Sequence, residues 1–408
     1  MTVHVVGAGL AGLAAGLTAA RAGHDVIIYE TAPMAGGRCR SFLDRGLGRV
    51  IDNGTHVVLG ANRIALGFMA SLGTKAEMVP AAKNLSFFDH RHGERWSLDV
   101  TGPGAAAMWR AAGGMGSRMR LLGGAAMGVR SGQTVAGAYG DLGDAYRRLI
   151  APLATAALNA PLDGADARAF ARVARRIMFG GKGALCPYVA RHSLGRALVD
   201  PAVAALESLG AELRYQDPLV AFDFEGNRVS RLDFRSGAVG LRDRDRVIVA
   251  VPPWGLPPLP RAIAPAGFTS HAILCAHYLI DRDSEAFAEA RMMGCIGGTA
   301  QWIARSGDIL SVTVSAADPW MGRASAGIAS TLWQEVCRAL DWGAVEMPAH
   351  RVIKERRATA VLAGGFGPRS TLDNLYFAGG WTCRRRPDTI EAAISSGIAA
   401  ARCLNRVN

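Results

Sequence analysis

A cluster of glycines near the start of the chain has the spacing of a nucleotide-binding turn. The pattern is G-x-G-x-x-G, directly after the apolar residues 3–6 and before an alanine-rich run. In such a turn the first glycine permits the tight bend, the second lets the backbone approach a pyrophosphate, and the third lets helix and strand pack closely. The residues expected to hold the nucleotide here are Gly7, Ala8, Gly9, Leu10, Ala11 and Gly12.

An acidic residue follows at the distance that this unit requires. Residues 25–29 predict a second strand, and Glu30 comes directly after it, 23 positions from Gly7 (30 − 7). A carboxylate there can accept hydrogen bonds from a ribose diol, whereas it would repel a 2′-phosphate. The motif by itself is also compatible with an ordinary glycine-rich turn. Strand, helix, strand and acid in this order predict a dinucleotide site.

A second pair of glycines indicates which dinucleotide binds. Gly36, Gly37 and Arg38 suit another approach to the same phosphates, because a guanidinium binds phosphate bidentately. The strand, the G-x-G-x-x-G turn, the strand ending in Glu and the G-G-R segment together resemble the FAD-binding start of the amine oxidase and phytoene desaturase superfamily. This resemblance, more than the spacing, favours FAD over a nicotinamide.

The resemblance implies further cofactor contacts in the middle of the chain. Residues 52–56 read D-N-G-T-H, which by themselves indicate only a tight turn. In the superfamily this segment returns to the flavin ring, which implies contacts at Gly54 and Thr55 and makes His56 the candidate catalytic residue. A lone histidine is more often structural than catalytic. By position, Leu219 would offer backbone groups to the adenine.

The C-terminal part carries the second signature of the superfamily. Residues 375–380 read L-Y-F-A-G-G, a strand that ends in Gly379 and Gly380, and a helix is expected to begin near Thr389 and Ile390. Asp388 or Thr389 can cap that helix, whose N-terminus favours negative charge. In the superfamily this helix faces the pyrimidine end of the flavin. The chain departs from the pattern at Gly380, where the superfamily usually has an acidic residue.

The nucleotide-binding unit and the resemblance imply an α/β protein, α+β overall, and the length predicts two domains. The 408 residues exceed one ordinary domain. We expect a discontinuous Rossmann-like FAD-binding domain from residues 1–80, 190–253 and 358–408. A second domain of antiparallel sheet and helices is expected to bind the substrate, from residues 81–189 and 254–357. Within it we expect a strand over residues 294–304.

The seven scattered cysteines contain no C-x-x-C, so we predict neither disulfides nor a metal site.

Within the superfamily the chain most resembles the hydroxysqualene dehydroxylases of hopanoid pathways. The similar segments are D-N-G-T-H-V-V-L-G-A from Asp52, P-L-A-T-A-A-L-N-A-P from Pro152, and A-G-G-W-T from Ala378 with T-I-E-A-A from Thr389. The resemblance implies reductive removal of a hydroxyl group from a polyprenoid lipid, with hydride from reduced FAD. The alternatives are an oxidising carotenoid desaturase or amine oxidase, and a lipid escort protein without redox activity, which Gly380 supports.

The charge of the chain bears on its partners. The formal net charge is +12, but no nucleic-acid fold signature is present, so we expect no nucleic-acid partner. Residues 100–140 contain arginines and methionines and no acidic residue. They are compatible with a surface that touches anionic lipid, or with core-facing helices whose arginines are solvated. We expect a cytoplasmic protein with peripheral contact on the inner face of the membrane. The sequence identifies no protein partner.

Overall fold

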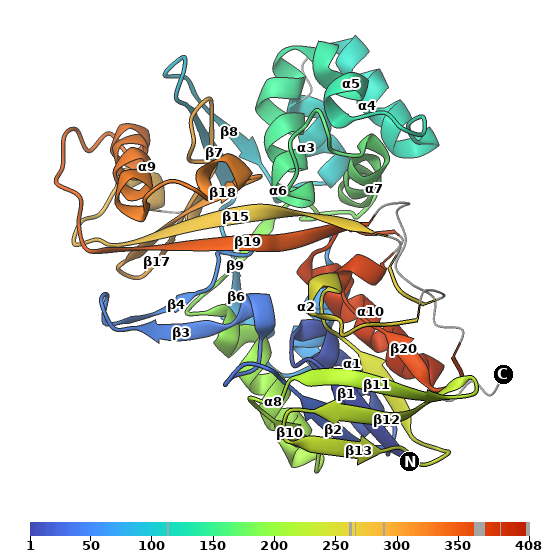
Figure 1. Ribbon diagram of the computed structural model, residues 1–408. Coiled ribbons are helices and arrows are strands. Elements are labelled where there is room, and N and C mark those ends of the chain that lie inside the picture. Colours follow the sequence, from blue (N-terminus) through green and yellow to red (C-terminus); the bar gives the residue numbers. More distant parts are fainter. Residues whose placement is uncertain are drawn as a thin grey trace.

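A parallel sheet of five strands forms one end of the molecule (Figure 1). The computed structural model describes residues 1–111, 114–260, 263–265, 267–288, 290–362, 372–383 and 385–404. The sheet draws its strands from four separate parts of the chain. Their order is β10 (Glu212–Arg214), β2 (Asp25–Tyr29), β1 (Thr2–Val6), β14 (Arg246–Val249) and β20 (Leu375–Phe377).

Each face of this sheet is covered by a different layer. Successive side chains of a strand point to opposite faces, so Val5 packs among the helices while Val6 packs against Phe222 on the other side. The helical layer comprises α1 (Leu10–Arg21), α8 (Asp200–Ser208) and α10 (Ile390–Cys403). The opposite layer is an antiparallel sheet of β11 (Leu219–Glu225), β12 (Arg228–Phe234) and β13 (Gly237–Gly240).

A second large sheet crosses the middle of the molecule, where β15 and β19 form long neighbouring strands (Figure 1). Helix α9 (Ser325–Ala339) covers one of its faces. The strand order is β19 (His350–Leu362), β15 (Phe268–Leu279), β18 (Ile309–Ser315), β17 (Trp302–Ser306), β16 (Met292–Ile296), β7 (Asn84–Asp89) and β8 (Arg95–Asp99).

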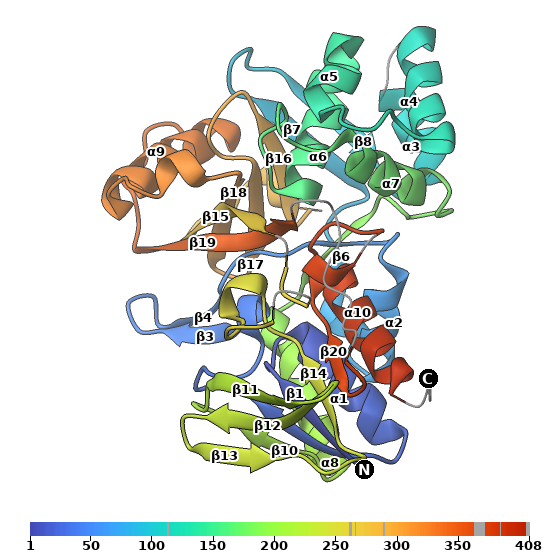
Figure 2. The same ribbon diagram turned by 45° about the vertical axis from the view of Figure 1, so that its right-hand side comes forward.

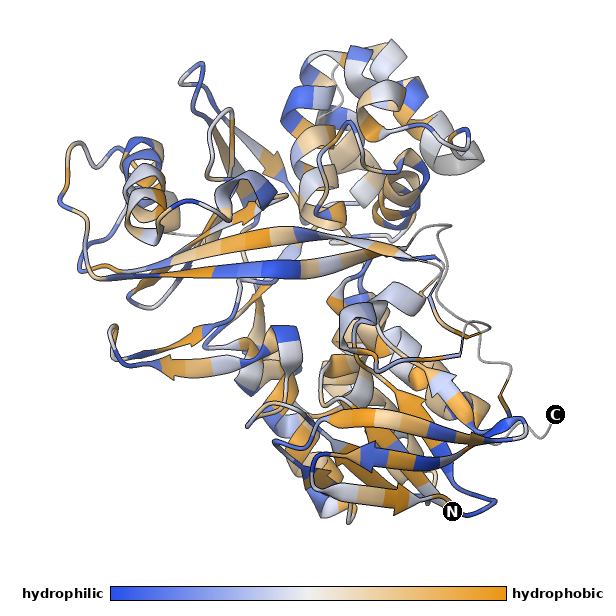
Figure 3. Ribbon diagram, viewed as in Figure 1, coloured by the Kyte–Doolittle hydropathy of each residue, from blue (hydrophilic) through white to orange (hydrophobic). Residues whose placement is uncertain are grey.

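A group of helices lies at the far end from the parallel sheet (Figure 2). Their apolar side chains pack with Leu85 and Phe87 of β7, and Figure 3 shows apolar residues along the strands beneath them. The helices are α3 (Gly104–Ala111), α4 (Met115–Met127), α5 (Val135–Tyr139), α6 (Ala151–Leu158) and α7 (Ala167–Met178).

Smaller elements connect the two ends of the molecule. Helix α2 (Arg63–Ser71) packs beside α10. One short sheet pairs β3 (Ser41–Asp44) with β4 (Arg49–Asp52), and another places β9 (Pro187–Ala190) between β5 (Val58–Leu59) and β6 (Met78–Pro80).

The predicted fold class is confirmed, and one predicted strand is wrong. The strand expected over residues 294–304 is two strands, β16 and β17, separated by a turn in which Gly297 has φ +75°. Strand β19 also continues to Leu362, beyond residue 357 where we expected the substrate-binding domain to end. The division into two discontinuous domains stays a prediction.

Helices α1 and α10 approach so closely that their backbones touch at Gly397. A Cβ atom there would lie 2.1 Å from the carbonyl oxygen of Ala11 and 3.0 Å from the amide nitrogen of Ala15. We expect Gly397→Ala to lower the free energy of unfolding by about 1–3 kcal/mol, because two helix backbones must separate. Urea denaturation measures the change.

A matched control is Gly327→Ala in α9, where a Cβ atom meets nothing within 4 Å. That variant should gain about 0.5–1 kcal/mol from the better helix propensity of alanine. Equal stability of Gly397→Ala and the unmodified protein would contradict the close helix contact.

Candidate active site between the two sheets

One cavity of about 620 Å³ extends from the glycine turn to the long strands of the second sheet. It brings together almost all the residues that the sequence singled out, from both ends of the chain. Ala8 and Gly12 are not among the residues that line it. The predicted residues that do line it are Gly7, Gly9, Leu10, Ala11, Glu30, Gly36, Gly37, Arg38, Gly54, Thr55, His56, Leu219, Gly379, Gly380, Thr389 and Ile390.

The glycine turn is shaped by close backbone contacts. Gly7 has φ +102°, a conformation that favours glycine. A Cβ atom at Gly12 would lie 1.8 Å from the carbonyl oxygen of Gly7, so Gly12 serves the packing of helix on strand. Gly9 is different, because a Cβ atom there meets nothing within 4 Å. The backbone at Gly9 therefore borders open space in front of α1.

The groups at this end of the cavity suit a dinucleotide. Gly9 caps α1 without a side-chain hydrogen bond, so the first amides of the helix remain available to a phosphate. The Glu30 carboxylate is held in place by the backbone amides of Ala8 at 2.7 Å and Ala32 at 2.9 Å. A carboxylate that is fixed at the cavity wall retains lone pairs for a ribose diol.

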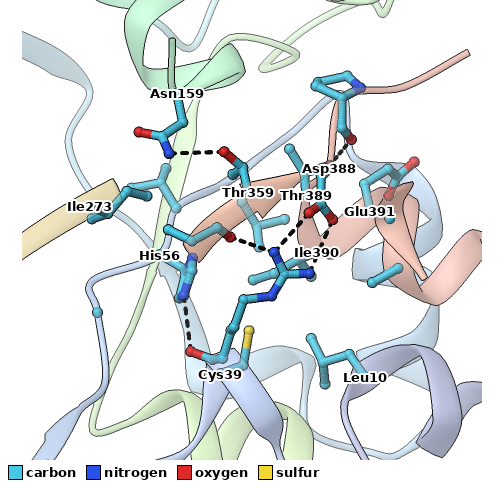
Figure 4. A pocket seen from close by; sticks show the side chains of 18 of the residues that line it. Leu10, Cys39, His56, Asn159, Ile273, Thr359, Asp388, Thr389, Ile390 and Glu391 are labelled. Atoms are coloured by element: carbon cyan, nitrogen blue, oxygen red, sulfur yellow. Dashed lines mark hydrogen bonds and ion pairs between the residues drawn. The ribbon is translucent and has the colours of Figure 1, made fainter. Parts of the chain in front are cut away.

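An ion pair lies in the middle of the cavity wall (Figure 4). The Arg38 guanidinium donates to both carboxylate oxygens of Asp388, at 2.8 and 3.1 Å, and also donates to the Ala358 carbonyl. The amide of Ala360 donates to the same carboxylate at 3.0 Å. Burial opposes the charge on Arg38, but Asp388 outweighs it and keeps the pKa of the guanidinium raised.

The missing acid at Gly380 has a structural counterpart in Asp388. A Cβ atom at Gly380 would lie 2.0 Å from Oδ1 of Asp388. The carboxylate eight residues further along the chain therefore occupies the space that a side chain at position 380 would enter. This part of the cavity wall carries a buried acid even though Gly380 has no side chain.

The N-terminus of α10 is built as its sequence predicts. The Thr389 hydroxyl accepts from the Ala392 amide at 3.4 Å, which confirms one of the two expected caps. Glu391 in the first turn is buried, and its carboxylate accepts from the Ala65 amide at 2.8 Å. Glu391 thereby caps α2, while the N-terminal end of α10 at Thr389 and Ile390 borders the cavity.

His56 lies at the centre of the cavity (Figure 4). Its Nε2 atom is 3.4 Å from the carbonyl oxygen of Arg38. Burial lowers the pKa of His56 and outweighs the effect of that carbonyl. The ring is therefore neutral at pH 7, and it can orient a hydroxyl group by hydrogen bonding more readily than it can act as a cationic acid.

The opposite end of the cavity is lined by apolar side chains from the second sheet and the helices. Phe87 and Trp302 meet edge to face there, with ring centroids 5.9 Å apart. Such a surface suits a long hydrocarbon chain. Its apolar lining residues are Leu85, Phe87, Leu98, Leu149, Leu153, Val173, Ile177, Met292 and Trp302.

Several polar residues between these two ends were not predicted from the sequence. Asn159, in the left-handed conformation at φ 47°, donates to the Thr359 hydroxyl at 2.9 Å (Figure 4). Cys275 and Glu355 line the same region. Asn159 lies in the segment from Pro152 that carries the family resemblance, which was the one local signal for it. Cys275 and Glu355 reach the cavity through strand pairing between distant segments, and their local sequence indicates no site.

The donors and acceptors of the cavity fit FAD. Glu30 suits the ribose, the turn at Gly9 and the N-terminus of α1 suit the pyrophosphate, and the N-terminus of α10 suits the electron-rich end of the ring.

Among the residues that the structure describes, no group of three or more His, Cys, Asp or Glu side chains is placed to hold a metal ion. The search for spans within the same residues finds no helix with the length and hydropathy needed to cross a membrane.

Comparison with known proteins identifies relatives of the whole chain. A family model described as a flavin-containing amine oxidoreductase matches residues 136–405, and one described as an NAD(P)-binding Rossmann-like domain matches residues 5–72. A hydroxysqualene dehydroxylase of Rhodopseudomonas palustris is 35% identical, over 98% of this chain and 97% of the relative.

One further relative matches part of the chain, and one solved structure matches its fold. A probable zeta-carotene desaturase of Synechococcus elongatus is 37% identical, over 25% of this chain and 21% of the relative. The solved structure of a putrescine oxidase double mutant aligns over 99% of both chains, with a TM-score of 0.72 and 17% identity. That structure supports the fold alone.

The ion pair between Arg38 and Asp388 can be tested separately from catalysis. We expect Asp388→Asn to weaken FAD binding by the apoprotein by about tenfold to a hundredfold, because Arg38 loses charge-assisted hydrogen bonds. Titration of apoprotein with FAD, followed by flavin fluorescence, measures the affinity. The matched control is Asp341→Asn, which breaks an exposed ion pair with Arg95. An unchanged affinity in Asp388→Asn would show that the ion pair between Arg38 and Asp388 does not support FAD binding.

Proposed function

Since the chain belongs to the flavin-containing amine oxidoreductase family and, within it, to the hydroxysqualene dehydroxylases, we propose that it converts hydroxysqualene to squalene. It is an FAD-dependent oxidoreductase. The proposed reaction breaks the carbon–oxygen bond of an allylic alcohol and forms a carbon–hydrogen bond in its place. When bound, reduced FAD supplies the hydride.

The observation that carries this proposal is the continuity of the cavity. The nucleotide-binding turn at Gly9 and the apolar surface around Phe87 and Trp302 line the same space. A polyprenoid chain in the apolar end would place a hydroxyl group beside the polar residues in the middle, among them Thr55, His56 and Asn159. Holding the reacting carbon at the flavin in this way lowers the entropic cost of the reaction.

The residues of the chain have three tasks in this mechanism. The neutral ring of His56 positions the hydroxyl group, with Asn159 and Thr359 as neighbours. The apolar surface around Phe87 and Trp302 holds the hydrocarbon chain. The apolar lining excludes water, which would otherwise capture the carbon. We also propose that the glycine turn, Glu30 and the N-terminus of α10 bind the FAD.

The helices at the far end supply a surface for lipid entry in this proposal. Met115 and Met119 on α4 are 61% and 58% exposed, and Phe179 after α7 is 63% exposed. Arg120 beside them pairs with Asp141, and residues 100–140 contain no acidic residue. We place the protein in the cytoplasm, with this surface against the anionic inner face of the membrane.

The reaction direction separates this proposal from its alternatives. The sequence similarity to carotene desaturases covers only part of the chain and fits an oxidising reaction of the same family. The alternative of a lipid escort without redox activity depended on the absent acid at Gly380. Asp388 supplies a buried carboxylate at that place, which removes the reason for that alternative.

An anaerobic reaction tests the proposed function directly. The purified protein is reduced with dithionite and mixed with hydroxysqualene. We expect the flavin absorbance to return while squalene forms in equal amount. A flavin that stays reduced, together with oxidation of another polyprenoid in air, would assign a desaturase reaction instead.

Vesicle binding tests the lipid surface. We expect the triple variant Met115→Ser, Met119→Ser, Phe179→Ser to lose most of its co-sedimentation with vesicles that contain phosphatidylglycerol, because three exposed apolar anchors are removed. The control is Leu43→Ser with Val220→Ser, which removes exposed apolar side chains elsewhere. Equal loss in both variants, or no binding by the unmodified protein, would contradict the proposed surface.

A further inference from the structure

The proposed reaction needs a proton for the oxygen that leaves, and a carboxyl group in the cavity could supply it. Among the residues that the structure describes, five side chains with a carboxyl group line the candidate active site. They are Glu30, Asp217, Glu355, Asp388 and Glu391. Their hydrogen bonds show which of the five is available for chemistry.

Four of the five carboxylates have a structural partner. Two backbone amides hold Glu30, the ion pair described above holds Asp388, and the first turn of α2 holds Glu391. Asp217 accepts from the hydroxyl group and the backbone amide of Ser236, at 2.6 and 3.0 Å. These four carboxylates are engaged by the fold or by the nucleotide end of the cavity.

Glu355 of β19 is held only by long hydrogen bonds. Its carboxylate accepts from the side-chain amide of Asn53 and from the backbone amide of Arg357, both at 3.4 Å. Hydrogen bonds of this length are weak. Within the described parts of the chain no cationic side chain forms an ion pair with Glu355. This half-buried carboxyl group therefore borders the cavity without a strong partner.

Strand pairing places Glu355 in the middle of the cavity. It stands opposite Ile273 of β15, which Figure 4 shows on the cavity wall together with Thr359. Two residues along β15, Cys275 also lines the cavity, and its Sγ atom lies 3.7 Å from the Thr55 hydroxyl. Glu355 thus lies in the region where the proposed function places the hydroxyl group of the substrate.

A bulge in β19 begins directly after Glu355. Residues 355 and 359 of β19 pair with residues 273 and 271 of β15, so β19 contains two extra residues here (4 − 2). Consecutive residues of a regular strand point to opposite faces, yet Arg357, Ala358 and Thr359 all line the cavity. Bulges often occur beside active sites, where they redirect side chains.

The other titratable groups near the centre of the cavity suit proton donation less well. The guanidinium groups of Arg38 and Arg357 keep their protons in proteins. Burial lowers the pKa of His56, so its ring is neutral and can only orient a hydroxyl group. A thiol is ordinarily a much weaker acid than a carboxyl group, so Cys275 ranks behind Glu355.

We propose that Glu355 is the general acid that gives its proton to the hydroxyl group as the carbon–oxygen bond breaks. This inference rests on the proposed function. The oxygen takes the proton and departs as water, while the carbon takes the hydride of the reduced flavin, which loses two electrons. The proton that is also released when FADH2 becomes FAD restores the carboxyl group. One alcohol and one FADH2 thus give one hydrocarbon, one FAD and one water.

A single turnover of the reduced enzyme with hydroxysqualene tests this role. The wild-type rate should fall as pH rises, because Glu355 loses the proton that it must give. Glu355→Gln should slow flavin reoxidation by about 10²–10⁴-fold and remove this pH dependence, with unchanged substrate affinity. Glu355→Asp should keep part of both, because the carboxyl group remains. The control Glu225→Gln makes the same change on a strand residue outside the cavity and should match the wild type.

Two results would overturn the role of Glu355. One is a Glu355→Gln variant whose rate and pH profile parallel the wild type. The other is loss of the pH dependence in His56→Gln or Cys275→Ala while Glu355→Gln retains it, which would assign the proton to the imidazole or to the thiol. Circular dichroism and the flavin spectrum establish that each variant is folded.

The same experiment separates this inference from the proposed function. A wild-type enzyme whose reduced flavin does not react with hydroxysqualene would refute the proposed function, and the acid role with it. A wild-type enzyme that forms squalene, together with an equally fast Glu355→Gln variant, would refute the acid role alone. Weaker binding of hydroxysqualene to oxidised Glu355→Gln, with an unchanged rate at saturation, would show that Glu355 only binds the substrate.

Discussion

The ion pair between Arg38 and Asp388 joins segments that are 350 positions apart in the sequence. It connects the loop after β2 with the loop before α10. Both residues also bond to the backbone of β19, because Arg38 donates to the Ala358 carbonyl and the Ala360 amide donates to Asp388. The Asp388 side chain is only 3% exposed, so breaking the pair would leave a buried carboxylate without its partner, which is destabilising. The shape of the cavity at its centre depends on this contact, because the walls that meet there come from both large sheets.

The parts of the site that sequence predicts are those with local geometry. The turn at Gly7 needs a positive φ, the cap at Thr389 needs a hydroxyl three residues before an amide, and Glu30 follows its strand directly. Each of these is determined within a few neighbouring residues, so its pattern is visible in the chain. Their contacts with FAD stay predictions.

The parts that escaped prediction depend on pairing across the fold. Cys275 reaches the cavity only because β15 lies between β18 and β19, a pairing that the local sequence does not show. The carboxylate of Asp388 could not be related to Gly380 from the sequence, because only the folded chain shows that the two residues lie together. The single strand expected over residues 294–304 failed for a local reason, since Gly297 and Gly298 form a turn within an apolar run.

The parallel sheet has a consequence for how the protein is made. Strand β1 leaves the ribosome some 240 residues before its neighbour β14, and β20 and α10 come later still. Contacts of such long sequence separation form slowly, because the intervening chain must be ordered as the loop closes. The Gly397 backbone can meet Ala11 only after α10 has been synthesised. The apolar faces of β1 and α1 must therefore be shielded during translation, and cofactor capture is a late event in the maturation of this protein.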